Sequence, residues 1–244
     1  MEYDVFGIAL TILCFFVAAV VQGAAGFGFG LVALGLLSTL MTFKTAAVLP
    51  VIAVLAVNVT IFVRLRKHFR LDRMVPLTVA ALAGVPLGVW FLDQADATIM
   101  RFSIGALLIV SAAYSLAPKL AARRWHPYWL GVPCGLLSGG LSGAFGTGGP
   151  PLVAYTITQG FERFRYSASL QFVFMVGTLV RLACLIAGGL VTRHDLAISA
   201  FGATAAVGGV LLGLKVLRRL ADQAIRMVAA VMLLLLGLKY LLIG

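Results

Sequence analysis

The sequence predicts an all-α, polytopic membrane protein built from two inverted repeats. The 244-residue chain is 62% hydrophobic and only 11% charged, whereas soluble domains carry about 25% charged residues. Apolar stretches of the roughly 20 residues that span a bilayer recur along the chain, and they lack the alternation of a β-barrel strand. Each half also contains a long apolar stretch that a glycine cluster interrupts. We therefore predict, for each half, one broken hairpin segment followed by three transmembrane helices.

The first repeat is predicted over residues 1–118. Its broken segment covers 5–41 and is interrupted by glycines between Gly23 and Gly30. As one helix this segment would be roughly 55 Å long, against a hydrocarbon core of about 30 Å, so it must fold back. The sequence leaves open whether both arms of the hairpin cross the bilayer. Three spans are predicted to follow, at 44–63, 74–92 and 98–117.

A linker at 119–126 is predicted to join this repeat to a second one over residues 127–244. The second broken segment covers 127–160, where a glycine cluster leads into Pro150 and Pro151. Further spans are predicted at 166–190, 196–214 and 223–243. Comparison of the chain with itself supports a duplication, because several small-residue positions recur at spacings of 117 to 125 residues. These pairs are Gly23 with Gly140, Gly26 with Gly143, Gly84 with Gly209, and Gly88 with Gly213.

The positions of the basic residues predict the orientation of the halves. The net charge is +11, and most basic residues gather in four connections, at 64–73, 118–126, 161–165 and 215–219. Loops of this kind face the cytoplasm. The excess of positive charge is therefore explained by membrane topology, and no nucleic-acid partner is expected. The four connections share one side only if each hairpin returns to the side it entered from. The second half is then upside down relative to the first, and both termini lie outside the inner (plasma) membrane.

The two glycine clusters predict a substrate-binding site. Interrupted helices in corresponding places of two halves point to the central site of a transporter, and each break aims a helix N-terminus, with its free N–H groups, at the protein centre. Such ends attract anions, and glycine lets an anion approach the backbone. The candidate substrate-binding residues are Gln22, Gly26, Gly28, Gly30, Ser142, Gly146, Thr147, Gly148, Gly149 and Arg181.

Other roles remain open for some of these residues. Glycines also allow close helix packing, and the stripe Gly131, Gly135, Gly139 and Gly143, like the pairs Gly84/Gly88 and Gly209/Gly213, is expected to serve that purpose. Arg181 stands alone within a predicted span, where a charge usually has a function, although its long stem can also reach the interface. Polar residues within spans either contact the ligand or bond neighbouring helices; they are Gln22, Asn58, Thr60, Gln171 and Thr178.

The titratable residues argue against several functions. All eight acidic residues and all three histidines are expected in loops or at helix ends, whereas cation transporters and proton pumps usually need such groups at membrane depth. We expect no metal, no cofactor, no catalytic residue and no enzymatic activity. Cys14, Cys134 and Cys184 form no metal-binding spacing; they are interpreted as small buried hydrophobes, with a thiol that contacts a sulfur substrate as the alternative.

The glycine clusters resemble those of the TauE/SafE family of sulfite and organosulfonate exporters. The resemblance rests on Gln22-Gly-Ala-Ala-Gly-Phe-Gly-Phe-Gly30 and on Gly139-Gly-Leu-Ser-Gly-Ala-Phe-Gly-Thr-Gly-Gly-Pro-Pro151, and chain length, duplication and basic loops fit it. It implies an inner-membrane transporter for a small sulfur-containing anion such as sulfite or a sulfonate. The residues alone predict only a small anion.

We therefore predict a secondary transporter that moves a small sulfur-containing anion, by export, through alternating access. An anion channel would use the same donors with weaker binding at several sites, and a thiol-dependent sulfur relay would need a reactive cysteine. The expected partners are the anion and the lipid bilayer, and a homo-oligomer is left open.

Overall fold

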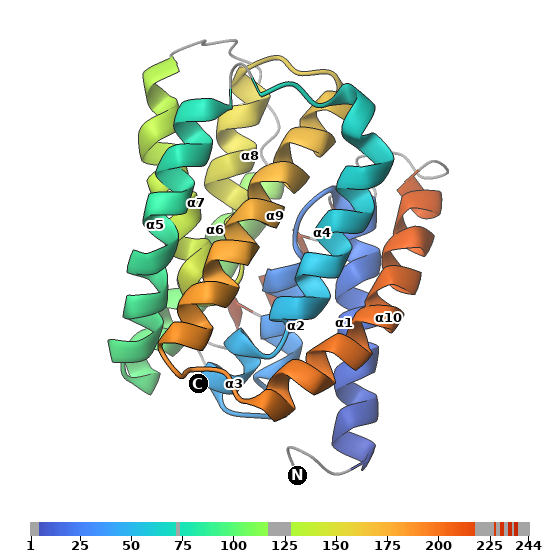
Figure 1. Cartoon of the computed structure of the whole chain (residues 1–244), viewed down its shortest axis with the longest axis vertical. Coiled ribbons are helices and arrows are strands. Elements are labelled where there is room, and N and C mark those ends of the chain that lie inside the picture. The colour runs from blue at the N-terminus through green and yellow to red at the C-terminus, as the bar shows by residue number, and fades with distance from the viewer. Residues whose placement is uncertain are drawn as a thin grey trace.

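The computed structural model describes residues 5–71, 74–116 and 128–217, together with 227, 230–231, 234–235 and 237–238. These residues form helices and contain no strand, which confirms the all-α class (Figure 1). Five described helical segments are long and apolar enough to cross a membrane: Val5–Ala25, Phe43–His68, Val75–Gln94, Phe164–Ala187 and Arg193–Lys215. The predicted linker at 119–126 and most of the predicted span at 223–243 lie outside the described residues.

The first broken segment is a hairpin with unequal arms. Helix α1 (Val5–Ala25) is long enough to span the bilayer, whereas α2 (Phe29–Leu37) has only nine residues. At 1.5 Å per residue α2 extends about 13 Å, less than half of the hydrocarbon core. Figure 1 shows α2 returning beside α1 toward the end that holds the N-terminus. The hairpin therefore re-enters, and its tip lies inside the protein.

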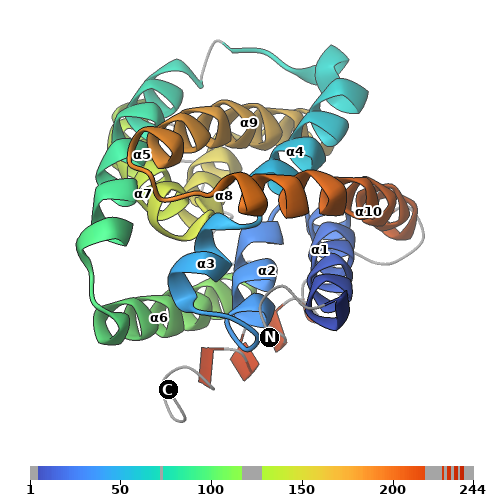
Figure 2. The same ribbon diagram turned by 60° about the horizontal axis from the view of Figure 1, so that its bottom comes forward.

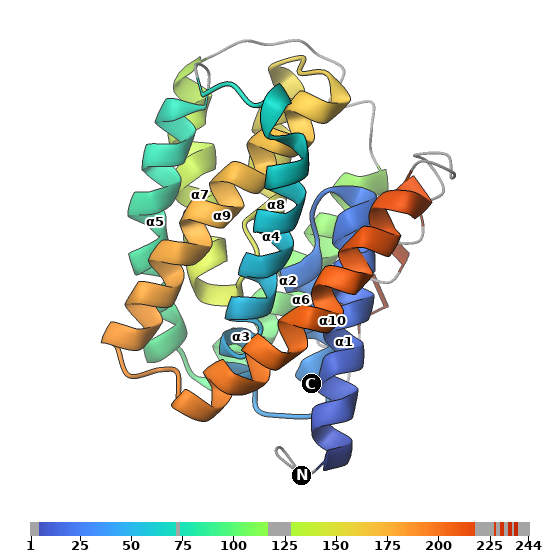
Figure 3. The same cartoon turned by 45° about the vertical axis from the view of Figure 1, so that its right-hand side comes forward.

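The second broken segment has the same form but enters from the opposite end (Figures 1 and 3). It consists of α7 (Gly131–Phe145) and α8 (Gly149–Thr158). The remaining elements are η1 (Arg66–His68), α5 (Val75–Gln94), α6 (Ala97–Leu116), η3 (Tyr128–Leu130), α9 (Arg163–Ala187) and α10 (Arg193–Leu217).

The span predicted at 44–63 is not one continuous helix. It consists of α3 (Phe43–Val48) and α4 (Val51–Leu65), separated at Leu49 and Pro50. Proline has no N–H group and its ring obstructs the preceding turn, which explains the break. The hydroxyl oxygen of Ser199 on α10 accepts from the backbone N–H groups of Ile52 and Ala53, at 3.1 and 3.2 Å. Ser199 thus satisfies the first N–H groups of α4 from another helix.

Small residues hold the helices in close pairs, as the sequence predicts. On α7, Gly135, Gly139 and Gly143 face the backbone of α5, and a Cβ at Gly139 would overlap the carbonyl of Ala81. On α10, Gly213 similarly faces the backbone of α1 at Val20. The packing role expected for these glycines is confirmed, since contacts this close exclude any side chain.

The most closely packed helix pairs each join one helix of the first half to one helix of the second half. The most extensive contacts join α5 of the first half to α7 of the second, and α10 of the second half to α1 of the first. Helices α4 and α9, which follow the two hairpins, pack on each other across the centre (Figure 3). This reciprocal arrangement supports the inverted repeat, which remains a prediction.

Basic residues of the described chain gather toward one end of the bundle. The α4–α5 connection and the α8–α9 loop lie at the upper end in Figures 1 and 3, and α10 ends in the upper half. These segments carry Arg64, Arg66, Lys67, Arg70, Arg165 and Lys215; this end is called the basic end below. Figure 2 brings the opposite end forward and shows α3 between α2 and α6.

Candidate functional site

The tips of the two hairpins have matching backbone conformations. Gly26 follows α1 with φ of 82°, and Gly146 follows α7 with φ of 71°. Both values lie in the left-handed region that glycine adopts without strain. The first helical residues, Phe29 of α2 and Gly149 of α8, come three residues later in each case. Corresponding positions at the tips are thus 120 residues apart, whereas the sequence comparison aligned Gly26 with Gly143.

The two tips touch each other at the centre of the protein. A Cβ at Gly30, in the first turn of α2, would overlap the carbonyl oxygen of Gly146. A Cβ at Gly149 would lie 2.9 Å from the ring of Phe27. Each tip is therefore built so that the other hairpin can approach its backbone. The first turns of α2 and α8 consequently lie beside one cavity rather than on separate surfaces.

Gln22 is the centre of a buried network of neutral side chains. Its Oε1 accepts the backbone N–H of Phe29 at 3.0 Å, and its Nε2 donates to Oδ1 of Asn58 at 2.6 Å and to Oε1 of Gln171 at 3.2 Å. Gln171 in turn donates from Nε2 to the carbonyl of Gly26 at 2.8 Å. The network therefore joins both sides of the first tip to α4 and α9.

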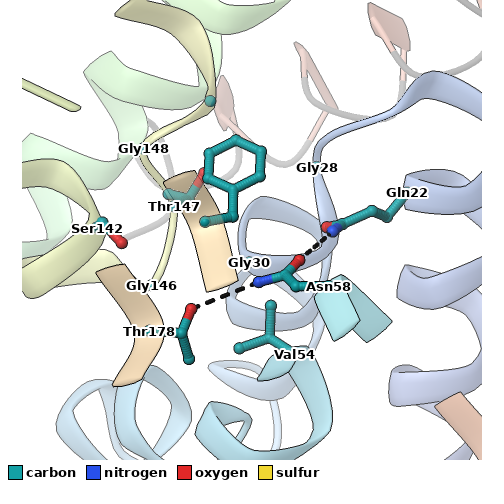
Figure 4. A pocket seen from close by; sticks show the side chains of 12 residues that line it. Gln22, Gly28, Gly30, Val54, Asn58, Ser142, Gly146, Thr147, Gly148 and Thr178 are labelled. Atoms are coloured by element: carbon teal, nitrogen blue, oxygen red, sulfur yellow. Dashed lines mark hydrogen bonds between the residues drawn. The ribbon is translucent and has the colours of Figure 1, made fainter. Parts of the chain in front are cut away.

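The direction of these hydrogen bonds is fixed by the backbone. The N–H of Phe29 can only donate, so Gln22 must turn Oε1 toward it and Nε2 toward Asn58. Asn58 then accepts with Oδ1, which leaves its Nδ2 group facing Thr178 at 3.5 Å. A hydrogen bond of that length is weak. Asn58 thus presents amide hydrogens on the pocket side, where Figure 4 shows it between Gln22 and Thr178.

The second tip contributes hydroxyl groups and backbone donors. Ser138 fixes the tip by donating to the carbonyl of Gly148 at 2.7 Å. Ser142 and Thr147 are buried residues that line the pocket, and within the described chain neither hydroxyl has a hydrogen-bond partner. Because Pro150 and Pro151 carry no N–H, Gly148 and Gly149 are the donors nearest this end of α8.

These groups surround one small pocket (Figure 4). Its lining residues are Gln22, Gly28, Gly30, Val54, Asn58, Ser142, Gly146, Thr147, Gly148, Gly149, Phe174 and Thr178. Its cavity volume is about 20 Å³, against the roughly 10–15 Å³ that one water molecule needs. The lining carries hydrogen-bond donors but no charged side chain. Such a pocket suits a compact anion.

Arg181 lies beside this pocket but not in it. It is 1% exposed and donates from Nε to the carbonyl of Gly143 and from Nη2 to the carbonyl of Ala47, both at 3.0 Å. A Cβ at Gly146 would lie 3.1 Å from Nη1. The interpretation that Arg181 reaches the membrane interface is wrong, because its guanidinium bonds the last carbonyls of α7 and α3, where helix dipoles favour a cation.

The structure thus brings most of the predicted site residues together. Gly26 stands just outside the lining, where its carbonyl anchors Gln171, and Arg181 lines a neighbouring cavity. Asn58 and Thr178 join the pocket, although the sequence indicated them only as polar groups within spans. Their spacing of 120 residues, the same as that of the two tips, is the signal that would have paired them. Cys14, Cys134 and Cys184 are not among the lining residues.

Comparison with known proteins extends over most of the chain. The profile of the family described as "Sulfite exporter TauE/SafE" matches residues 11–240. A curated protein of Cupriavidus necator, described as "Probable sulfite/organosulfonate exporter TauE", is 29% identical over 168 residues, which cover 66% of this chain and 64% of that protein. The match therefore spans slightly less than two thirds of the relative's length. No solved structure matches the chain. On the family match over residues 11–240, the chain belongs to the TauE/SafE sulfite exporter family.

Proposed function

We propose that the protein is a secondary transporter that exports a small sulfur-containing anion, sulfite or an organosulfonate, and that the pocket between the two hairpin tips is its binding site. The observation that carries the proposal is the convergence of two helix N-termini and several neutral donors on one small cavity. Family membership and the curated relative support a sulfur-containing anion as the substrate.

The anion is held by backbone and neutral side-chain donors. The start of α2 at Gly30 and the start of α8 at Gly148 and Gly149 offer partly positive helix ends, each worth up to about 2 kcal/mol when partly buried. Hydroxyls of Ser142 and Thr147 add hydrogen bonds to a charged group, each worth about 1.5–3 kcal/mol. Together these groups favour a compact oxyanion, and they avoid the cost of burying a fixed positive charge in the site.

Alternating access is the mechanism that the predicted inverted repeats would support. If the halves are inverted repeats, each hairpin tip closes the pocket toward one side of the membrane, and small rotations exchange which tip is closed. The packing of α5 on α7 and of α10 on α1 supports this mechanism, because motion of either half is transmitted to the other through these contacts. The two tips and the pair Asn58 and Thr178 would lie near the axis of that motion.

The side chains that line the pocket do not titrate near neutral pH, so coupling is assigned to the substrate itself. Sulfite can carry its own proton, and a dianion can leave a cell down the membrane potential, which is worth about 2.3 kcal/mol per charge at 100 mV. We place the basic end in the cytoplasm of a bacterial-type inner membrane, in accordance with the positive-inside rule.

Uptake of labelled sulfite into liposomes that contain the purified protein tests this function. We expect saturable uptake that accelerates when the liposomes are preloaded with unlabelled sulfite, because a carrier returns faster when loaded. Sulfoacetate, thiosulfate and sulfate serve as competitors and define the substrate class. Flux that shows neither saturation nor counterflow would identify a channel instead. If folded protein moves none of these anions, the proposed function is wrong.

A further inference from the structure

A second cavity shares a wall with the pocket. Its lining includes Arg181 together with apolar residues of α2, of α3 and of the break before α4, such as Leu34, Ala47 and Pro50. Gly30, Val54 and Gly146 line both cavities. The contact between the two hairpin tips at Gly30 and Gly146 is therefore the boundary between the two spaces.

Arg181 contributes a positive charge to the lining of this cavity. It is the charged residue of the lining, and both of its hydrogen-bond partners in the described chain are backbone carbonyl oxygens. Carbonyl groups satisfy the donors of a buried guanidinium but do not neutralise its charge, which remains costly away from water. Nη1, the nitrogen beside Gly146, makes neither of these two bonds. An anion in the cavity would supply the missing charge.

The cavity lies on the far side of the pocket from the basic end. Helix α9 begins at the basic end, and Arg181 follows Thr178 by three residues, which is about 4.5 Å farther along the helix axis. An anion that leaves the pocket away from the basic end therefore meets Arg181 next. One wall of this cavity is the break at Pro50, where α3 and α4 are not joined by continuous helical hydrogen bonds.

From these observations we infer that Arg181 forms a second, transient anion site on the exit side of the pocket. There the anion competes with the carbonyl oxygens of Ala47 and Gly143 for the guanidinium. When the anion binds, the guanidinium releases the end of α3, and the cavity can widen at the break beside Pro50. The inference rests on the proposed function and adds a separate step to it: the pocket selects the anion, and Arg181 controls its release.

Transport and binding by variants of Arg181 test this inference. In the reconstituted protein, Arg181→Met is expected to lower maximal sulfite flux about tenfold or more, because the attraction of the guanidinium for the anion is lost. A tenfold change in rate corresponds to roughly 1.4 kcal/mol. Its equilibrium sulfite affinity, measured in detergent, should stay close to that of the wild type. Arg181→Lys, which keeps the charge, should recover most of the flux. Flux that is unchanged in Arg181→Met, or affinity that falls as much as flux, would overturn the inference.

A chemical probe separates an anion site from a purely structural clamp. In a variant whose three native cysteines are replaced by serine, Ala47→Cys places a thiol in the second cavity. The matched control is Ser167→Cys, which lies 120 residues farther along, at the corresponding place beside Gly26. The reaction rates of an anionic sulfonatoethyl and a cationic trimethylammonium methanethiosulfonate are compared at each position, with Arg181 present or replaced by glutamine.

We expect the ratio of anionic to cationic rates at position 47 to fall about tenfold when Arg181 is replaced by glutamine, because the attraction of a buried cation is lost. The ratio at position 167 should not change. An equal ratio with and without Arg181 at position 47 would show a structural clamp only. If the wild-type protein binds neither sulfite nor any of the competitor anions, the proposed function itself is wrong and the inference falls with it.

Discussion

Gly30 on α2 packs directly against the carbonyl group of Gly146 at the end of α7, and no Cβ fits between them. These residues belong to hairpins that enter the protein from opposite ends (Figure 1). Their contact closes one wall of the candidate pocket and at the same time brings the starts of α2 and α8 to it. The geometry of the site therefore depends on the absence of a side chain at Gly30.

Adding a single methyl group at this contact should disable the protein. We expect Gly30→Ala to reduce sulfite flux about tenfold or more and to lower the melting temperature, because overpacking against a backbone group costs about 1–3 kcal/mol. Gly140→Ala is the matched control, since a Cβ there meets nothing within 4 Å and alanine favours a helix by up to about 1 kcal/mol. Equal flux in the two variants would contradict the contact. Melting temperature and flux are measured on the same preparations.

Two substitutions of Gln22 separate an effect on protein stability from an effect on anion binding. Gln22→Ala should lower stability, because the N–H of Phe29 and Oε1 of Gln171 lose a buried partner, at about 1–3 kcal/mol each. Gln22→Glu keeps an acceptor for Phe29 but places a negative charge beside the pocket. At about 4 Å and an effective dielectric constant near 20, that repulsion is about 4 kcal/mol, so sulfite affinity should fall by at least 100-fold.

The exposed residue Gln94, at the end of α5, provides the charge control for this pair. Gln94→Glu should bind sulfite like the wild type in titration calorimetry. Wild-type affinity in Gln22→Glu would place the anion elsewhere in the protein.

The break between α3 and α4 predicts an effect on stability. Ser199→Ala removes the hydroxyl that accepts from Ile52 and Ala53, which leaves two buried N–H groups without this partner. We expect a loss of about 1–3 kcal/mol, visible as a lower melting temperature. Thr204→Ala on the same helix is the control, because Thr204 is exposed and its hydroxyl donates to the carbonyl of Phe201 in its own turn. If the two variants have the same melting temperature, the capping role of Ser199 is wrong.

Membrane orientation can be tested with thiol labels at the two ends of the bundle. In a variant whose native cysteines are serine, Gln94→Cys lies at the end opposite the basic end, and Glu162→Cys lies at the basic end; both positions are exposed. An impermeant maleimide should label the first in intact cells and the second only after permeabilisation, because basic loops face the cytoplasm. The reverse pattern would invert the proposed direction of export.

Sequence patterns could predict the hairpins because each glycine inside a helix costs about 1 kcal/mol relative to alanine, so a cluster of them in an apolar stretch marks a turn. That Gly139 packs closely against another helix was predictable for a related reason, since small residues four apart mark a helix contact; which helix it meets, α5, was not. The break at Pro50 was not predicted, because a proline inside an apolar stretch is tolerated when neighbouring helices satisfy the freed groups. Here Ser199 does so from a helix that lies almost 150 residues later.

The position of Arg181 shows what sequence alone could not provide. A lone arginine within a span indicates a function, but the choice between ligand contact, interface and helix clamp depends on which carbonyl groups lie around it. Asn58 and Thr178 illustrate the same limit, because each is an ordinary polar residue until the fold brings them together. Only the hairpin tips, whose glycines are required by the backbone itself, carried a local signal for the site.

The most direct test of the central claim is to locate a bound anion. Selenite, the selenium analogue of sulfite, is soaked into crystals at a concentration that blocks sulfite uptake, and its anomalous scattering is mapped. We predict the strongest peak in the pocket, within hydrogen-bond distance of the backbone at Gly30 and at Gly148. A strongest peak outside the space between the two hairpin tips, or no peak there while uptake is blocked, would contradict the account.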